Sequence, residues 1–226
     1  MVGAVMQGSV GYGMNLVAAP IFALLDPTLI PVPLLLVSTV HAVLTVGREY
    51  RHADWSGVGW AMVGRVPGSV LGVLAVALLP QRPFSVVVGV AVLVCVALSL
   101  ISWHPRPTPR ALVVAGVAGG TFGTAATIGG PPIALLYQHE TGPTIRATMA
   151  SYFAIGSLVS VGALAIGGQV HGDPIGKSAL LLPFLVAGFL LSGPLRKVLD
   201  GGWMRPAVLG VAAISAAALI MRSVVG

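Results

Sequence analysis

Residues 120–137 read GTFGTAATIGGPPIALLY, and residues 8–25 read GSVGYGMNLVAAPIFALL. Both stretches lack charged side chains, and both place glycine and proline within an otherwise apolar run. Helix-breaking residues are tolerated at membrane depth where neighbouring groups satisfy the freed backbone or where the chain lines a cavity. The two stretches therefore predict an apolar helix that is interrupted at two places in the chain.

The whole 226-residue chain is strongly apolar, since 56% of its residues are hydrophobic, 8% are charged and the mean hydropathy is +0.97. Soluble domains carry about 25% charged residues because their surface must be hydrated. So few ionised side chains cannot hydrate a chain of this length, which excludes a water-soluble fold. The fold class that we predict is an all-α polytopic membrane protein.

Charged residues divide the chain into hydrophobic segments, and a spanning helix needs about 20 residues. The connections between them are short, polar and rich in glycine or proline, as loops at a membrane interface are. Two of the segments contain an interrupting residue, Arg65 or Pro183. The eight predicted segments are 1–25, 27–47, 57–79, 83–105, 111–139, 147–172, 178–195 and 206–221.

The two opening stretches align with each other at an offset of 112 residues, which sets Pro20 against Pro132. The turn-rich residues 103–110 lie close to the midpoint of the chain, and a repeat across a midpoint indicates an internally duplicated fold. We predict a first membrane repeat at 1–102, a linker loop at 103–110 and a second membrane repeat at 111–226, with four segments in each repeat. The other identical pairs are Gly8 with Gly120, Gly11 with Gly123, Ile21 with Ile133, and Leu24 with Leu136.

The distribution of Lys and Arg over the loops tests two topologies, because cytoplasmic loops are enriched in these residues. If all eight segments span, the two sides carry six and five, which decides nothing. If the first segment of each repeat dips in and returns, the sides carry eight and three, so we favour inverted repeats with broken or re-entrant first segments. The eight are Arg48, Arg51, Arg106, Arg110, Arg146, Arg196, Lys197 and Arg205, and the three are Arg82, Lys177 and Arg222.

An interrupted helix exposes backbone amide groups, which attract anions. We therefore predict a substrate site around the two interruptions, although close packing of small residues between helices is an alternative explanation. A single hydroxyl can also bond back to its own helix, whereas the amide of Asn15 cannot be satisfied so locally. The predicted site residues are Gly8, Gly11, Tyr12, Gly13, Asn15, Pro20, Gly120, Gly123, Thr124, Thr127, Gly129, Gly130, Pro131 and Pro132.

Two ionisable side chains, His41 and Arg65, fall at membrane depth, where such residues are functional candidates by default. His41 either couples transport to protons or bonds a neighbouring helix. Arg65 either supplies a counter-charge to an anion or snorkels to the bilayer interface. The sequence leaves both pairs of alternatives open.

Other functional classes find little support. All six carboxylates lie in predicted loops, the one cysteine lies in an apolar segment, and the histidines form no metal motif. The twelve Lys and Arg are scattered over many loops, as membrane-flanking residues are. We therefore predict no enzymatic activity, cofactor, metal or nucleic-acid partner.

The stretches GYGMNLVAAPIFALLDPTLIPVPLLL (11–36), HADW (52–55) and GGTFGTAATIGGPPIALLYQHETGPTIRATMASYFAIGS (119–157) resemble the two halves of the sulfite exporter TauE/SafE family, also called the toluene-sulfonate-uptake permease family. The resemblance implies an inner-membrane permease for small, often sulfur-containing anions. Thr124 and Ala125 stand where the first repeat has Tyr12 and Gly13, and His41 stands where a small polar residue is more usual. The family's motifs map onto Gly8, Gly11 and Gly13, onto Gly130, Pro131 and Pro132, and onto the loop residue Arg146.

The function that we predict is a permease that moves a small anion, sulfite or an organosulfonate by resemblance, across the inner membrane. Its expected partners are that anion and membrane lipid, and assembly into a homo-oligomer stays open. The alternative is a non-transporting membrane subunit that packs against a partner through small-residue helix faces. Polar groups around a cavity favour the permease, and a dry, fully packed interface favours the subunit.

Overall fold

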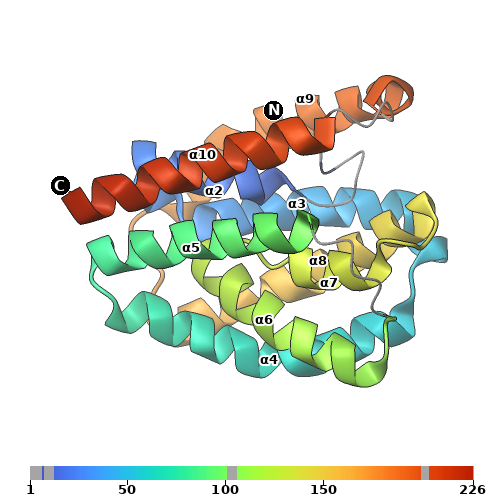
Figure 1. The fold of residues 1–226 in the computed structure, drawn as a ribbon, viewed down its shortest axis with the longest axis horizontal. Helices are drawn as coiled ribbons and strands as arrows, with labels where there is room; N and C mark the ends of the chain where they lie inside the picture. The colour runs from blue at the N-terminus through green and yellow to red at the C-terminus, as the bar shows by residue number, and fades with distance from the viewer. Residues whose placement is uncertain (1–6, 8–12, 101–105, 200–203, 226) are drawn as a thin grey trace.

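The computed structural model is built from helices throughout the residues that it describes, which are 7, 13–100, 106–199 and 204–225 (Figure 1). This confirms the predicted all-α fold class. Two short 3-10 helices, η1 (Pro27–Leu29) and η2 (Tyr50–His52), join longer elements. The α-helices are α2 (Met14–Leu25), α3 (Val32–Glu49), α4 (Trp55–Leu78), α5 (Gln81–Leu100), α6 (Pro109–Ala126), α7 (Pro131–Tyr137), α8 (Gly142–Ile166), α9 (Pro174–Leu199) and α10 (Met204–Val225).

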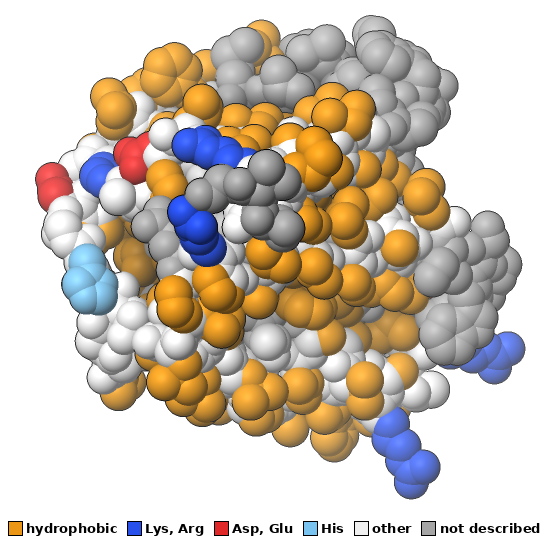
Figure 2. All heavy atoms as spheres, turned by 60° about the vertical axis from the view of Figure 1, so that its left-hand side comes forward, with side chains coloured by type: hydrophobic (Ala, Val, Ile, Leu, Met, Phe, Trp, Pro, Cys, Tyr) orange, Lys and Arg blue, Asp and Glu red, His pale blue; other side chains and the backbone are white. Residues whose placement is uncertain are grey.

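Several of these helices are suited to a bilayer. In the described part of the chain, four stretches are long and apolar enough to cross one: Val32–His52, Trp55–Leu78, Gly142–Ile166 and Pro174–Ser192. Their outer faces carry exposed apolar side chains, such as Val63, Val66 and Val70 on α4, which are each more than half exposed. Figure 2 shows hydrophobic side chains covering most of the visible face. The chain is therefore a multi-pass membrane protein.

The second predicted interruption is present as a break between α6 and α7. Thr127 ends α6 in the left-handed conformation, with φ of 63°, and its amide donates to the Phe122 carbonyl. Pro131 and Pro132 begin α7, where the missing N–H groups would have no helical partner in any case. The glycines and prolines at 129–132 therefore divide one charge-free run into the two helices α6 and α7.

The break sends the chain back towards the side from which it came. Helix α6 runs parallel to α4, so that Gly64 lies against Val113 and Gly72 lies against Thr124. Helix α7 then ends at Tyr137, whose hydroxyl donates to Asp54 immediately before α4. Both ends of the α6 and α7 pair therefore lie at the end of the bundle where α4 begins (Figure 1).

Helices α4 and α6 touch through glycine, a contact that we call the α4–α6 glycine contact. Five glycines form the contact, and a Cβ added at any one of them would overlap the backbone of the facing helix. Such close approach is common in membrane helix pairs, where small residues allow tight backbone packing. The contact comprises Gly64, Gly68 and Gly72 of α4 with Gly116 and Gly120 of α6.

The remaining helices pair across the two halves of the chain. Helix α3 packs on α8, where Thr39 Oγ1 donates to Ser157 Oγ at 2.7 Å. Helix α4 also packs on α8, and α3 also packs on α9. Helix α10 contacts both α5 and α2. The largest buried apolar cluster joins α2, α5 and α10, and it contains Cys95 as a fully buried packing residue.

The cationic loop residues divide between the two ends of the bundle. Helix α3 ends beside the start of α8, where Arg146 forms a salt bridge with Glu49 at 2.9 Å. At the other end, Lys177 bonds Thr28, and Arg222 donates to the Leu24 carbonyl. Among the helix-end and loop cations whose side chains are described, those at the first end are Arg48, Arg51, Arg106, Arg110 and Arg146, and those at the second are Arg82, Lys177 and Arg222.

Candidate functional site

The two interrupted segments meet at Asn15. Helix α2 begins at Met14, directly after Gly13, whose φ of 118° is a left-handed conformation that glycine adopts without strain. Asn15 Nδ2 lies 2.9 Å from Ser38 Oγ on α3 and 2.8 Å from the carbonyl oxygen of Thr127, to both of which it donates. The start of α2 is therefore bonded to the break between α6 and α7.

A small cavity of about 20 Å³ lies at this junction, with room for about one water molecule. Its lining combines backbone from the α6 and α7 break with polar side chains from α2 and α3. Thr127 Oγ1 is buried there and has no hydrogen-bond partner within the described residues. The lining includes Gly13, Asn15, Ser38, Thr127, Gly129 and Gly130.

Arg65 lies close to this junction, in the interior of the bundle. Its side chain is only 2% exposed, so its guanidinium does not snorkel to the bilayer interface. The guanidinium carbon lies 4.7 Å from the centre of the Tyr152 ring, within the range of a cation–π contact. Nη2 donates to Ser160 Oγ at 3.2 Å, and Ser160 Oγ also accepts from Thr124 Oγ1 at 2.8 Å.

Glycine makes the room that this guanidinium occupies. A Cβ at Gly123 would lie 3.0 Å from Nη2, and a Cβ at Gly129 would lie 3.2 Å from Nη1. A Cβ at Gly156 of α8 would overlap Nε and the guanidinium carbon. Since Gly129 also lines the junction cavity, Arg65 and the cavity share one wall.

Two polar atoms of Arg65, Nε and Nη1, are buried without a hydrogen-bond partner in the described chain. Buried guanidinium groups are normally paired, because an unpaired buried charge is strongly unfavourable. Ser69 Oγ, one turn further along α4, and Tyr152 Oη on α8 are also buried without a partner there. The site therefore holds one fixed cation and several buried hydrogen-bonding groups that have no partner in the described chain.

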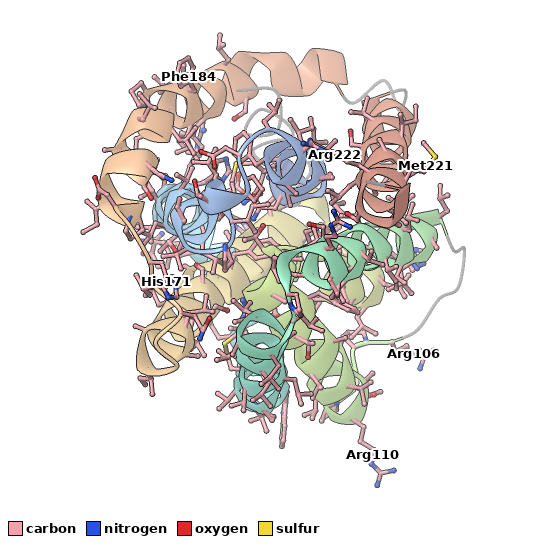
Figure 3. The ribbon with its side chains drawn as sticks, turned by 90° about the vertical axis from the view of Figure 1, so that its left-hand side faces the viewer. Arg106, Arg110, His171, Phe184, Met221 and Arg222 are labelled. Atoms are coloured by element: carbon pink, nitrogen blue, oxygen red, sulfur yellow. The ribbon has the colours of Figure 1, made fainter. Side chains whose placement is uncertain are left out.

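A larger cleft of about 860 Å³ opens at the end of the bundle where α5 begins and α10 ends. Arg82 and Arg222 line it together with Ser85 and Ser223, and none of its described lining residues is acidic. Figure 3 looks onto this end, where Arg222 and His171 are labelled. Cationic clefts raise the local concentration of anions.

Asp26, in the connection beside this cleft, is already engaged by neighbouring groups. Hydrogen bonds from the side chain and the backbone of Thr28, together with the charge of Lys177, lower the pKa of its carboxyl. Its negative charge is therefore largely balanced locally.

Comparison with known proteins decides the family. The family model for the sulfite exporter TauE/SafE matches residues 1–219. The chain belongs to the TauE/SafE family. A protein of Cupriavidus necator named "Probable sulfite/organosulfonate exporter TauE" is 24% identical over 200 residues, which cover 84% of this chain and 78% of that protein. No solved structure matches the chain significantly.

Family membership makes this chain a membrane protein of a transporter family. The loop arginine that the TauE/SafE resemblance selects, Arg146, ties the start of α8 to the end of α3 through Glu49. Nearby, Tyr137 Oη donates to Asp54 Oδ2 at 2.6 Å, and Thr148 Oγ1 accepts from the Asp54 amide at 3.0 Å. At this end of the TauE/SafE bundle, these bonds join the end of α3, the start of α4, the end of α7 and the start of α8.

The predicted site residues divide into several groups in this TauE/SafE structure. Gly8, Gly11 and Tyr12 lie outside the described residues. Pro20 does not end a helix but lies buried within α2, because a proline in a packed helix is tolerated where its lost hydrogen bond is compensated. Gly120 belongs to the α4–α6 glycine contact. The residues at the junction or beside Arg65 are Gly13, Asn15, Gly123, Thr124, Thr127, Gly129, Gly130, Pro131 and Pro132.

His41 lies apart from these groups. It is 1% exposed on α3, and its ring meets Phe189 of α9 edge to face at a centroid distance of 5.4 Å. The Arg48 guanidinium lies 5.8 Å from the centre of the same Phe189 ring.

Sequence reasoning missed three residues of α8 beside Arg65, namely Tyr152, Gly156 and Ser160. Their spacing of four residues places them on one helical face. A polar and small-residue stripe at that spacing is the signal that could have found them. In the described part of the chain, no group of three His, Cys, Asp or Glu side chains is arranged to hold a metal ion.

Proposed function

We propose that this chain is an inner-membrane permease that binds a small sulfur oxyanion, sulfite or an organosulfonate, where its two interrupted segments meet. The observation that carries the proposal is the bond from Asn15 Nδ2 to the Thr127 carbonyl oxygen, which joins the start of α2 to the α6–α7 break beside a small cavity. Transporters commonly bind substrate where discontinuous segments of two repeats meet near the bilayer midplane.

The proposal includes two inverted repeats, at 1–102 and 111–226, joined by the loop 103–110. It is supported by the return of α7 to the end where α4 begins, since this makes α6 and α7 a re-entrant pair. With that pair re-entrant, the helix-end and loop cations whose side chains are described fall five at one end and three at the other. The positive-inside rule then assigns the end with Glu49 and Arg146 to the cytoplasm.

The substrate class rests on family and chemistry together. The Cupriavidus necator relative is named for sulfite and organosulfonate export, and the sulfur-bound oxygens of such anions accept hydrogen bonds from amide, hydroxyl and guanidinium donors. Hydroxyl and guanidinium donors without a partner in the described chain lie at the junction or beside it, on Thr127 and Arg65, while the Asn15 amide is already bonded to Ser38 and Thr127. We propose transport, rather than chemical conversion, of that anion.

The small-residue faces of α4 and α6 argue against the partner-subunit alternative. Their glycines are covered by each other inside the chain, because added Cβ atoms would overlap the facing backbone. These faces are therefore not free to receive another subunit.

The test is flux through the purified full-length chain in lipid vesicles. Vesicles loaded with sulfite or methanesulfonate should release the anion faster than protein-free vesicles, and faster than vesicles that hold the variant Asn15→Leu. Thr121→Val is the matched control, because the Thr121 hydroxyl only bonds back to the Val117 carbonyl. Parental protein that is folded and releases none of these anions would refute the proposed function.

A further inference from the structure

We infer that Arg65 binds the substrate's negative charge, and that its single uncompensated cation makes the site select monoanions over dianions. The inference rests on the proposed permease function and concerns the same site. Nothing in the family match or in the relative's name assigns a role to this residue.

Arg65 has no anionic partner among the described side chains. Asp54, the acidic residue that caps α4, lies eleven positions away, which is about 16 Å along a helix. Its carboxylate is bonded to Tyr137 and to the Gly57 amide. Glu49 is bonded to Arg146, so the described salt bridge involves a different arginine. The charge of Arg65 is thus unmatched in this part of the chain.

Only partial charges face the guanidinium in this conformation. The Tyr152 ring offers its negative face at 4.7 Å. Gly123 lies in the last turn of α6, so the guanidinium also meets the negative end of that helix dipole. These contacts hold the cation in place without neutralising it. One full negative charge is what the site lacks.

The groups around Arg65 suit an oxyanion. Within the described residues, Nε and Nη1 of Arg65 and Oη of Tyr152 are buried and have no hydrogen-bond partner. The same holds for the hydroxyl of Thr127, which lies on the break that borders both the cavity and Gly129. Guanidinium donors make short, strong hydrogen bonds to anionic oxygens. Glycine at 123, 129 and 156 lets the backbone of α6, of the α6–α7 break and of α8 approach the guanidinium closely.

Charge balance then decides between anions of the same shape. A sulfonate or bisulfite monoanion neutralises Arg65, whereas a sulfate dianion leaves a net negative charge among buried apolar groups. Buried net charge is unfavourable whichever sign it has. Methanesulfonate and sulfate are both tetrahedral and similar in size, so they differ chiefly in charge.

The experiment measures the thermal unfolding midpoint of the purified full-length chain against concentrations of methanesulfonate and of sulfate at constant ionic strength. A ligand that binds the folded state raises this midpoint in a concentration-dependent way. We expect methanesulfonate to bind at least about tenfold more tightly than sulfate, as loss or excess of one charge-assisted contact implies. Equal binding of the two anions, or tighter binding of sulfate, overturns the inference.

Two variants test the residue itself. Arg65→Gln should remove methanesulfonate binding and flux, and Arg110→Gln is the control, because Arg110 projects from the bundle into solvent (Figure 3). Arg65→Lys keeps the charge without the planar fork, so it should bind more weakly and still prefer the monoanion. This second variant decides the matter if Arg65→Gln does not fold.

The outcomes separate the inference from the proposed function. If the parental chain transports sulfite and Arg65→Gln does so equally well, the inference fails and the permease stands. If the folded parental chain moves and binds no sulfur anion, both fail.

Discussion

Tyr137 Oη donates a hydrogen bond of 2.6 Å to Asp54 Oδ2, and this bond fastens the end of α7 to the start of α4. Asp54 Oδ1 meanwhile accepts from the Gly57 amide at 2.9 Å and so caps α4. One carboxylate therefore holds the end of α7 and caps the start of a long helix.

Tyr137→Phe should destabilise the protein because it removes this bond from a buried ring without changing the ring's packing. A hydrogen bond to a charged group contributes about 1.5–3 kcal/mol, and we expect a loss in that range by denaturant unfolding in detergent. Tyr50→Phe is the control, since Tyr50 is half exposed. Equal stability of the two variants would show that the bond does not hold α7.

Gly156→Ala should displace the Arg65 guanidinium, because the new Cβ would overlap Nε. We expect lower thermal stability and at least about tenfold slower sulfite flux, as overpacking and a moved charge imply. Gly162→Ala on the same helix is the matched control, because a Cβ there meets nothing within 4 Å. Parental flux through the alanine variant at 156 would mean that the guanidinium position does not matter for transport.

Asn15→Asp should lose transport more completely than Asn15→Leu. The carboxylate cannot donate to the Thr127 carbonyl, and its charge repels an anion from the junction. We expect flux in vesicles to fall by at least about tenfold, the effect of one charge-assisted contact. The idea of an anion site at the junction is abandoned if the aspartate variant is folded and transports normally.

The loops that contain Arg51, Arg110, Arg146 and Lys197 should all face the cytoplasm. Single cysteines placed in these loops, after Cys95→Ala, should resist an impermeant thiol reagent in intact cells, whereas Ser85→Cys and His171→Cys should react. Labelling that separates the Arg110 loop from the Arg146 loop would instead restore a fully spanning segment between them.

His41→Gln should flatten the pH dependence of transport if His41 couples the anion to protons, because glutamine keeps hydrogen-bonding capacity and does not titrate. The ring of His41 contacts Phe189 edge to face, and the Arg48 guanidinium lies near the same Phe189 ring. Flux should be compared with the parent over the range from pH 5.5 to 8. An unchanged profile would return His41 to a packing role against α9.

Charge spacing predicted the helical segments well, because an ionised side chain within a bilayer is costly and so marks a loop. Gly129, Gly130 and the two following prolines likewise predicted the α6 and α7 break, since consecutive prolines remove two amide donors. The same reasoning was wrong for the single proline Pro20. Helix α2 continues through Pro20, and it begins at Met14, directly after Gly13. A single proline does not specify where a packed helix starts.

The position of Arg65 could not be predicted from its own segment. An arginine side chain can turn inwards only where the interior has room for its guanidinium. Here that room is made by Gly123, Gly129 and Gly156, which are distant from Arg65 in the sequence. Its hydrogen-bond partner Ser160 is 95 residues away in the chain. Local sequence holds no information about such a distant partner.

The α4–α6 glycine contact has a mechanical consequence. Backbones that touch without intervening side chains cannot slide past each other by small rotamer changes, so α4 and α6 move as one rigid body. Arg65 rides on that body, while Asn15 belongs to α2, which packs on α10. In the permease that we propose, alternating access therefore separates the fixed charge from the amide, and the bond between Asn15 and Thr127 lies on the boundary that opens.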